Sequence, residues 1–551
     1  MRDPSDKGHN GDVTVIESIA SWARSLCFED IPVDVVELLR AQRRSVIASV
    51  ASSINDDASK RILNAVKTWS RPGNAPLFGS FLSDESFPLV SVEDALYAAS
   101  AQSIALDFDD YICFGHTGHS SVLVPILLSC ETGTDVQEQL VNQVIANEIG
   151  ARLGGACLLG PLNGQLWSFI HAGATAVAAG RMLGLDEKQL ANSLAISLTA
   201  APRPTAPGFM APDTKLITAA EPILVGLRAA RLGASSVTGP LDVLEHPHGF
   251  FEAFSYAPLT SMFNSLGKSW ATRTMSAKMY PGCAYIDTAV DALLELTESG
   301  LRADSVDSVI VKAGIMTCGM NAMSSGYSSN PTPVTVNFSI PLNVATVLIA
   351  GELTPNQINA KWLLDNSDAI ASLSRKTTLQ HDFSCTKKTA DAFVQILPIG
   401  GILGEVDKKK LVAAIGKIHS DHSSFKLSFG EMSGLVSTIP EVLQMSWNRL
   451  KNFNLESGTG ENELMGDLAT QNFKMTFPAI VDVKLKNGET LHAQADVPKG
   501  GAGNIKVSPI TVAREKFDTW APLAFGQNGA SAISNAIDED SDLVASLLDS
   551  K

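Results

Sequence analysis

The sequence predicts a mainly α-helical protein that carries a smaller α+β domain. Apolar residues recur at three- and four-residue spacing through the first 270 residues, as on the buried face of a helix. From about residue 271 β-branched residues alternate with polar ones, and from about residue 511 the helical spacing returns. We therefore expect one helical domain built from both ends of the chain and an α/β domain between them.

Amphipathic spacing and small-residue composition place the helices of the first part. Ser91 and Asp94 form a capping box ahead of an alanine-rich run. The stretch around His171 is rich in small residues and almost uncharged, which is typical of a helix buried on most sides. Helices are expected, in chain order, over residues 14–26, 33–50, 91–106, 166–185 and 216–234.

Two segments of the second part alternate as strands do. Residues 307–315 predict one strand, and residues 477–497 predict a hairpin whose turn, Asn487-Gly488, is the pair favoured in type I′ turns. Between them, lysine clusters and glycine-rich stretches at about 383–473 indicate an insertion. The expected division is a flexible N-terminus at 1–12, a helical domain at 13–270, an α/β domain at 271–510 that contains the insertion, and a return to the helical domain at 511–551.

The composition limits the possible functions. With 551 residues, 45% of them hydrophobic and 18% charged, the chain is typical of a globular enzyme with more than one domain. A net charge of −16 argues against nucleic acid as a partner, and no apolar run is long enough for a membrane span. Seven cysteines without C-x-x-C spacing predict buried thiols, and the polar start of the chain predicts a cytoplasmic protein. An anionic substrate would need a local cationic pocket.

The stretch A-L-D-F-D-D-Y-I-C-F-G-H-T-G-H places carboxylates and histidines where apolar helices end. Histidine titrates near neutral pH and a nearby aspartate can orient it, which favours an acid/base site. A metal site is an alternative, although the glycines beside the histidines disfavour one helix presenting both rings; a capped helix end with solvated carboxylates is another. The residues concerned are Asp107, Asp109, Asp110, His116 and His119.

Three further positions carry polar groups that chemistry could use. His171 in an apolar helix is either catalytic or a hydrogen-bonded core residue. Lys215 follows a loop rich in proline and glycine at the start of a helix, where it is either a surface lysine or a cation that binds a carboxylate beside the helix amides. Lys278 and Tyr280 precede Cys283, whose use as a nucleophile would need a partner that stabilises the thiolate.

These polar stretches belong to a longer series of motifs. In chain order they are D-F-D-D, H-S-S-V-L-V-P, a histidine opening a helix that ends in M-L-G-L, T-K-L-I-T-A-A-E-P-I, G-P-L-D-V-L-E-H-P-H-G-F-F-E-A-F, K-M-Y-P-G-C and F-S-I-P-L-N-V-A-T-V-L-I-A-G-E-L. The series resembles the MmgE/PrpD family, whose members include 2-methylcitrate dehydratase, cis-aconitate decarboxylase and iminodisuccinate epimerase. The resemblance covers most of residues 13–382 and 474–540. Tyr111 and Cys283 stand where threonine and histidine are more common, and at both positions the chain is similar to the fungal cis-aconitate decarboxylases.

The resemblance implies a helical domain, a smaller lid domain, a homodimer, and a cleft between the domains that works without metal or organic cofactor. It also implies site residues, among which we expect Asp107 to orient a histidine. The catalytic positions carried over are Asp107, His119, His171, Lys215 and Lys278, and the positions expected to contact substrate are Tyr111, His116, Tyr280 and Cys283.

The expected function is that of a cofactor-independent lyase acting on a citrate- or aconitate-like acid. We expect decarboxylation of a cis-aconitate-type substrate, with alkyl-substituted acids of secondary metabolism included. Dehydration of a 2-methylcitrate- or alkylcitrate-type acid would use the same residues and is the alternative. A second alternative is a family member without catalytic activity, which serves as a binding or assembly subunit through the insertion at 383–473.

Overall fold

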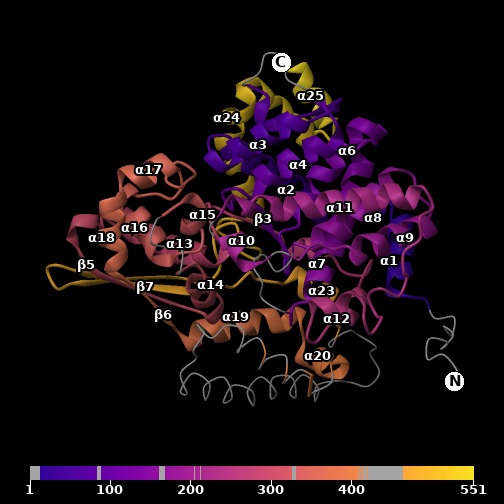
Figure 1. The fold of residues 1–551 in the computed structure, drawn as a ribbon. Coiled ribbons are helices and arrows are strands. Elements are labelled where there is room, and N and C mark those ends of the chain that lie inside the picture. Colours follow the sequence, from indigo (N-terminus) through magenta and orange to yellow (C-terminus); the bar gives the residue numbers. More distant parts are fainter. Residues whose placement is uncertain are drawn as a thin grey trace.

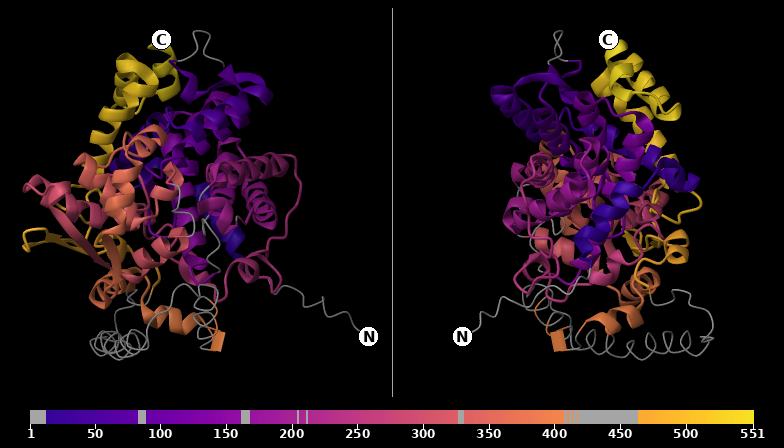
Figure 2. Two further views of the ribbon diagram at one scale, coloured as in Figure 1. Left: turned by 60° about the vertical axis from the view of Figure 1, so that its left-hand side comes forward. Right: turned by 90° about the vertical axis from the view of Figure 1, so that its right-hand side faces the viewer.

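The computed structural model describes residues 13–82, 89–160, 168–203, 205–210, 212–325, 331–406, 409–410, 413, 417 and 463–551. They form a larger helical lobe and a smaller lobe with a four-stranded sheet, which confirms the predicted fold class (Figures 1 and 2). The expected flexible N-terminus at 1–12 and residues 418–462 of the expected insertion lie outside the described residues. Among the helices that are described, none combines the length and the apolar character needed to cross a membrane.

The helical lobe takes its helices from both ends of the chain, as the indigo, magenta and yellow ribbons of Figure 1 show. The long C-terminal helix α24 packs along α2, and α8 packs between α7 and α11. The helices of this lobe are α1 (Val15–Ser25), α2 (Val33–Ser52), α3 (Asp57–Trp69), α4 (Val92–Ile104), α5 (Gly118–Ser121), α6 (Leu123–Thr132), α7 (Val136–Ala156), α8 (Ile170–Met182), α9 (Glu187–Thr199), α10 (Ala206–Met210), α11 (Ile217–Ala234), α12 (Phe250–Phe254), α24 (Pro509–Asp538) and α25 (Leu543–Asp549).

The start of α4 shows how tertiary contacts modify a local signal. Ser91 caps the helix as predicted, because its side chain accepts a hydrogen bond from Asp94 N (3.3 Å). The second half of the predicted capping box does not form, since Ser91 N donates to the carbonyl of Arg71 (2.8 Å). That bond belongs to the region where β1 (Pro72–Pro76) pairs with β2 (Leu89–Val90), so strand pairing takes the donor that the box would use.

The smaller lobe contains one sheet with the strand order β6-β5-β7-β8. β5 (Val306–Ala313) runs parallel to β6 (Thr377–His381) and antiparallel to β7 (Ala479–Leu485), which pairs with β8 (Thr490–Ala495). Figure 1 shows α13, α16 and α18 on one side of this sheet and α19 on the other. The helices around it are α13 (Asp287–Glu298), α14 (Ile315–Ser325), α15 (Pro333–Val336), α16 (Ile340–Ala350), α17 (Ala360–Asp365), α18 (Ser367–Arg375) and α19 (Phe383–Ile396).

The hairpin of β7 and β8 forms as predicted, but its turn does not. Gly488 has a φ of 91°, whereas Asn487 does not adopt the positive φ that a type I′ turn requires at both central residues. Leu485 N donates to the carbonyl of Glu489 (2.8 Å), and Gly488 N donates to the carbonyl of Leu485 (2.9 Å). Residues 486–488 therefore form a longer loop in which only the glycine is left-handed.

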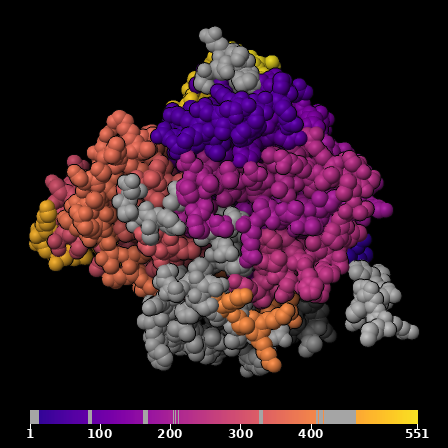
Figure 3. Space-filling view, in the orientation of Figure 1, coloured from indigo at the N-terminus to yellow at the C-terminus, as the bar shows by residue number. Residues whose placement is uncertain are grey.

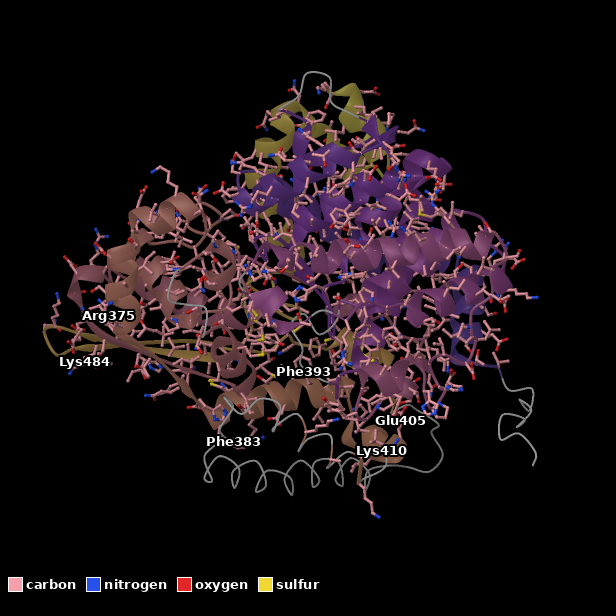
Figure 4. All side chains as sticks on the ribbon, in the orientation of Figure 1. Arg375, Phe383, Phe393, Glu405, Lys410 and Lys484 are labelled. Atoms are coloured by element: carbon pink, nitrogen blue, oxygen red, sulfur yellow. The ribbon has the colours of Figure 1, made fainter. Side chains whose placement is uncertain are left out.

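Helices at the start of the expected insertion connect the two lobes. Phe393 of α19 contacts Phe114 in the helical lobe (6.1 Å between ring centroids) and Phe473 (5.4 Å). In α20 (Ile399–Glu405) the carboxylate of Glu405, labelled with Phe393 in Figure 4, accepts a hydrogen bond from Ser261 N (2.7 Å). This part of the segment is packed against its neighbours, and the boundaries of the insertion stay a prediction.

The two lobes share a hydrophobic core. One cluster of buried residues continues from α2, α4 and α6 of the helical lobe into α13, α16 and β5 of the smaller lobe. In the space-filling view the orange smaller lobe lies directly beside the indigo and magenta helical lobe (Figure 3). Polar groups buried between the lobes are therefore surrounded by packed apolar side chains, where charges interact strongly.

Candidate active site

A short strand pairing brings the D-F-D-D stretch beside K-M-Y-P-G-C. β3 (Asp110–Tyr111) pairs antiparallel with β4 (Ser276–Ala277). Asp107 and Asp109 precede β3, and Lys278 follows β4 directly. The pairing therefore sets two carboxylates against one ammonium group.

Two aspartates and two lysines form a buried group that we name the lysine–aspartate array: Asp107, Asp109, Lys215 and Lys278. Lys278 Nζ donates to Asp107 Oδ1 (2.6 Å), to Asp109 Oδ1 (2.9 Å) and to the carbonyl of Asp107 (2.9 Å). Lys215 Nζ donates to Asp107 Oδ2 (3.0 Å). Asp107 thus lies between the two ammonium groups, and Lys278 joins the two carboxylates.

Burial and mutual attraction together set the charges of the array. Both lysine side chains are fully buried, so the interpretation of Lys215 as a surface lysine is wrong. Burial raises the pKa of Asp107, but Lys215 and Lys278 outweigh this effect and hold the pKa well below its usual value. Burial lowers the pKa of Lys278, but Asp107 and Asp109 outweigh it and raise this pKa. The expected cationic pocket is therefore charge-balanced, with one carboxylate for each ammonium group.

Asp109, and not Asp107, is the carboxylate beside the histidines. His116 Nδ1 lies 2.7 Å from Asp109 Oδ2, and His119 Nε2 lies 3.2 Å from the same oxygen. The expectation that Asp107 orients a histidine is wrong, because the lysines occupy both of its oxygens. The other ring nitrogen of His119, Nδ1, lies 2.7 Å from Ser103 Oγ, which holds the ring between α4 and the aspartate.

His171 lies next to His119 at the first turn of α8. The two ring centroids are 5.5 Å apart with an edge-to-face geometry, and His171 Nδ1 lies 2.9 Å from Ser120 Oγ. Burial, reinforced by His119, lowers the pKa of His171 well below its usual value, so the ring is neutral near pH 7. Neither Nε2 atom has a hydrogen-bond partner of normal geometry within the described structure. The interpretation of His171 as a hydrogen-bonded core histidine explains the contact of Nδ1 with Ser120. It does not explain why Nε2 has no hydrogen-bond partner.

The backbone of the D-F-D-D stretch is strained. Asp107 has a φ of 53° and Phe114 a φ of 68°, in the left-handed region that residues with side chains rarely adopt. Each such residue costs on the order of 1 kcal/mol or more, and such strain persists where surrounding contacts enforce it. Gly118 is also required, because a Cβ there would lie 1.9 Å from Asp110 Oδ1.

Lys215 is enclosed by side chains from both lobes. Its ammonium group lies 5.7 Å from the ring centroid of Phe209 in α10 and 5.1 Å from that of Phe338 in the smaller lobe. With the amide of Asn337 oriented so that its oxygen faces the lysine, Lys215 Nζ donates to that oxygen (2.9 Å). The array therefore lies at the boundary between the lobes.

The two tyrosines expected to contact substrate differ in their surroundings. The hydroxyl of Tyr280 donates to Asp291 (2.6 Å), so this group is already engaged. The hydroxyl of Tyr111 is buried and lies toward Ser276 without forming a hydrogen bond of normal geometry. Of the two hydroxyls, only that of Tyr280 is therefore engaged by a carboxylate.

The remaining positions expected to contact substrate are Cys283 and His116. Burial, with a contribution from Asp107, raises the pKa of the Cys283 thiol to about 12, which disfavours its use as a nucleophile. The side chain of His116 is 25% exposed, so it is the accessible end of the histidine group. The expectation of buried thiols fails at Cys27, which is exposed.

Two supporting residues were missed from the sequence. Lys516 reaches the D-F-D-D stretch from α24, donates to the carbonyl of Phe108 and to Ser45 Oγ (3.1 Å), and has its pKa lowered to about 7 by burial. Gln42 Nε2 donates to Asp110 Oδ2 (2.7 Å), and burial, with Asp109, raises the pKa of Asp110 to about 6. No sequence signal marks these residues, since both act across long separations along the chain.

Asp109, His116 and His119 could also hold a metal ion, because each offers one ligand atom and these atoms lie within 4.8 Å of one another. The lysine–aspartate array disfavours a metal ion at these residues. Lys278 Nζ already donates to Asp109 at 2.9 Å, and a divalent cation on the same carboxylate would meet this ammonium group at short range. Acid/base use of the histidines agrees better with these contacts.

Comparison with known families agrees with the resemblance of the motifs. Sequence models of the MmgE/PrpD N-terminal domain and of the MmgE/PrpD C-terminal domain match residues 17–261 and 280–421. The chain belongs to the MmgE/PrpD family. The second match continues into the segment expected to be inserted, up to residue 421.

Curated relatives of this MmgE/PrpD protein include fungal enzymes. The chain is 25% identical over 305 residues to a cis-aconitate decarboxylase from Aspergillus terreus, and equally similar to a cis-aconitate decarboxylase from the strain NIH 2624 of that species. Each match covers 51% of this chain and 60% of the length of the relative. The similarity supports membership of a family that contains lyases.

Proposed function

We propose that this protein is a lyase that decarboxylates an acid of the cis-aconitate type. The observation that carries the proposal is the buried lysine–aspartate array with two histidines beside it: His119 Nε2 lies 3.2 Å from Asp109, and His171 Nε2 has no hydrogen-bond partner. Ammonium groups held in a buried site stabilise developing negative charge more strongly than they would in water. The similarity to cis-aconitate decarboxylases supports the same reaction class.

The charge balance of the array defines how a polycarboxylate would bind. Lys215 and Lys278 already donate to Asp107, so substrate carboxylates would share these ammonium groups with the aspartates. The expected homodimer and the absence of metal or organic cofactor remain part of the proposal. Binding would depend on donors that are fixed in place before the substrate arrives, which lowers the cost of reorganisation.

Decarboxylation needs an electron sink and a proton. Departure of CO2 from an unsaturated tricarboxylate leaves an electron pair that spreads through the neighbouring double bond toward a remaining carboxylate. The ammonium groups of Lys215 and Lys278 would stabilise this charge. His119 would deliver a proton to carbon through Nε2, because His171, whose pKa is lowered by burial, is neutral near pH 7 and a poor acid.

Dehydration of a 2-methylcitrate- or alkylcitrate-type acid is the second candidate, because the two neighbouring histidines could divide its work. One imidazole would remove a proton beside a carboxylate while the other protonates the leaving hydroxyl group. The 5.5 Å between the ring centroids of His119 and His171 is compatible with both roles on one substrate.

Incubation with cis-aconitate, citrate, 2-methylcitrate and alkyl-substituted analogues, followed by mass spectrometry of the products, tests the proposal. A loss equal to the mass of CO2 supports decarboxylation, and a loss equal to the mass of water supports the dehydratase. The control is a His119→Gln variant, which keeps a polar side chain and removes the proposed proton donor. If the wild type leaves every one of these acids unchanged, both candidates are contradicted.

A role as a binding or assembly subunit is the candidate of another class, favoured by the long segment beyond the family match. A deletion of residues 422–462 tests it, since this deletion leaves every described residue in place. An assembly subunit should lose a partner in size-exclusion chromatography of the deleted form, whereas a lyase should keep its turnover. Deleting all of 383–473 would instead remove Phe393 and its contacts with Phe114 and Phe477.

A further inference from the structure

Asp287, the first residue of α13, is a buried carboxyl group without a partner. Its exposed fraction is 1%, and neither carboxyl oxygen has a hydrogen-bond partner. Asp107, Asp109 and Glu148, which are also buried, all accept hydrogen bonds from side chains or backbone. An ionised carboxylate in this position would be buried without compensation, which is far more costly than a neutral carboxylic acid.

The surroundings of Asp287 favour the neutral acid. Burial raises its pKa well above the usual value, and the positive charge of Lys278 opposes this effect without cancelling it. Asp287 follows the K-M-Y-P-G-C stretch after one 3-10 turn, η6 (Ala284–Ile286). The charged and titratable groups that act on it or feel its charge come from several elements, and are Lys278, Asp107, Asp291, Lys516, Tyr111, Tyr280 and Cys283.

The neighbours of Asp287 provide further uncharged groups. The Tyr111 hydroxyl is buried without a normal hydrogen bond, and its pKa is raised by burial and then by Asp287. The Cys283 thiol is neutral as well, since burial raises its pKa to about 12. The buried groups that interact with Asp287 therefore include neutral O–H and S–H groups beside the ammonium group of Lys278.

A polycarboxylate at the array needs such groups. The two ammonium groups are already matched by Asp107 and Asp109, so they cannot neutralise every carboxylate of a di- or tricarboxylic acid. A neutral O–H group can donate to a carboxylate oxygen without adding charge, and hydrogen bonds to a charged group are the stronger kind. An ionised aspartate at the same place would repel the substrate.

We propose that Asp287 is a substrate-binding residue of this site, which as an un-ionised carboxylic acid donates its O–H to one carboxylate of the bound polycarboxylic acid. This inference rests on the proposed function and extends it, because it assigns recognition of a substrate carboxylate to a neutral donor. Asp291, one turn further along α13, is a matched control: its carboxylate already accepts from Tyr280 Oη (2.6 Å) and Lys499 N (2.9 Å).

Calorimetric binding of cis-aconitate and of tricarballylate to the full-length protein tests the inference. Asp287→Asn keeps a neutral donor and should bind within about threefold of the wild type, whereas Asp287→Leu, which fills the space without a donor, should bind roughly tenfold or more weakly. Asp291→Asn should leave binding unchanged. Thermal unfolding of each variant shows that it is folded; Asp287→Asn should raise Tm above pH 5, because the native state no longer has to hold a proton on a carboxyl group.

The outcomes separate the two levels of the proposal. If the wild type binds either acid and Asp287→Leu binds it equally well, the role of Asp287 is overturned and the lyase proposal stands. Equal weakening by Asn and by Leu overturns the neutral donor, since it shows that the ionised carboxylate is what binding needs. A wild type that binds neither acid, and that turns over none of the acids tested above, overturns the proposed function and this inference together.

Discussion

Two buried clusters of acidic and basic side chains in this protein differ in how completely their polar atoms are hydrogen-bonded. Glu148 and Arg152 of α7 are both fully buried and paired with each other. The Glu148 carboxylate also accepts from Ala271 N (2.8 Å), Thr272 N (2.9 Å) and Thr272 Oγ1 (2.7 Å), while Arg152 donates to the carbonyl of Ser269 (3.2 Å). This cluster fixes a connecting segment onto α7.

The lysine–aspartate array is incomplete by comparison. Beside it, His171 Nε2, Asp110 Oδ1 and both oxygens of Asp287 have no hydrogen-bond partner among the described residues, and Asp107 is held at a positive φ. His119 Nε2 has only the Asp109 carboxylate nearby, at 3.2 Å without normal hydrogen-bond geometry. In the Glu148–Arg152 cluster only Arg152 Nε lacks a partner among the atoms of the pair. A closed network of partners indicates a structural ion pair, whereas unpaired buried atoms beside an ion pair indicate a place for a ligand.

The largest effect is expected from Lys278→Met, because it removes the partner of two buried carboxylates. Stability should fall by about 3–5 kcal/mol, and turnover of the accepted acid should be lost by at least about 100-fold. Urea unfolding and kcat/KM measure the two effects. Adding Asp107→Asn should restore part of the stability and none of the turnover; normal turnover by Lys278→Met would show that the array is structural only.

Arg152→Met tests the other side of the comparison. It should destabilise the protein by about 3–5 kcal/mol, since Glu148 is left buried with an uncompensated charge. The fraction that stays folded should keep the kcat and KM of the wild type. A fall in kcat beyond the folded fraction would mean that the two clusters are coupled.

Asp109→Asn should lower kcat by on the order of 100-fold, the usual contribution of general acid–base catalysis. The physical reason is that Asp109 contacts His116, His119 and Lys278. Asp110→Asn is the control on the same stretch, and it should change kcat much less. A larger loss of kcat in Asp110→Asn than in Asp109→Asn would show that Asp110, and not Asp109, is the functional carboxylate.

Asp110 should make stability depend on pH in mildly acidic solution. Its pKa in the folded protein is about 6 and its usual value is 3.8, so the folded state binds the proton more tightly. The contribution of Asp110 to stability is therefore greatest below about pH 4 and falls by up to about 3 kcal/mol as the pH rises through about 6. Urea unfolding across this range should show a flatter profile for Asp110→Asn, and an unchanged profile would contradict the raised pKa.

Chelation should have the smallest effect. Activity on the accepted acid should survive exhaustive treatment with a metal chelator, because Lys278 and the histidines satisfy Asp109 without a metal ion. Loss of turnover after chelation, followed by recovery with zinc or iron, would establish the alternative metal site at Asp109, His116 and His119.

The sequence by itself predicted the helices near residues 14–26, 33–50, 91–106, 166–185 and 216–234, the strand near 307–315 and the hairpin near 477–497. It could do so because the spacing of apolar residues along a helix or strand is a local property. Through its resemblance to a family it also predicted that Asp107, His119, His171, Lys215 and Lys278 belong to one site. The structure brings these residues together, and their catalytic roles stay predictions. The Asn487-Gly488 hairpin and the cap at Ser91 were predicted at the correct places for the same local reason.

Only the tertiary structure decided which charged group meets which. Lys278 and Asp107 are 171 residues apart and Lys516 and Phe108 are 408 apart, so no local pattern can pair them. The same packing places the histidines beside Asp109 and buries Lys215. It also leaves the carboxyl group of Asp287 without a hydrogen-bond partner. The physical reason is that burial determines the protonation and the partners of a titratable group, and burial is a property of the whole packed chain.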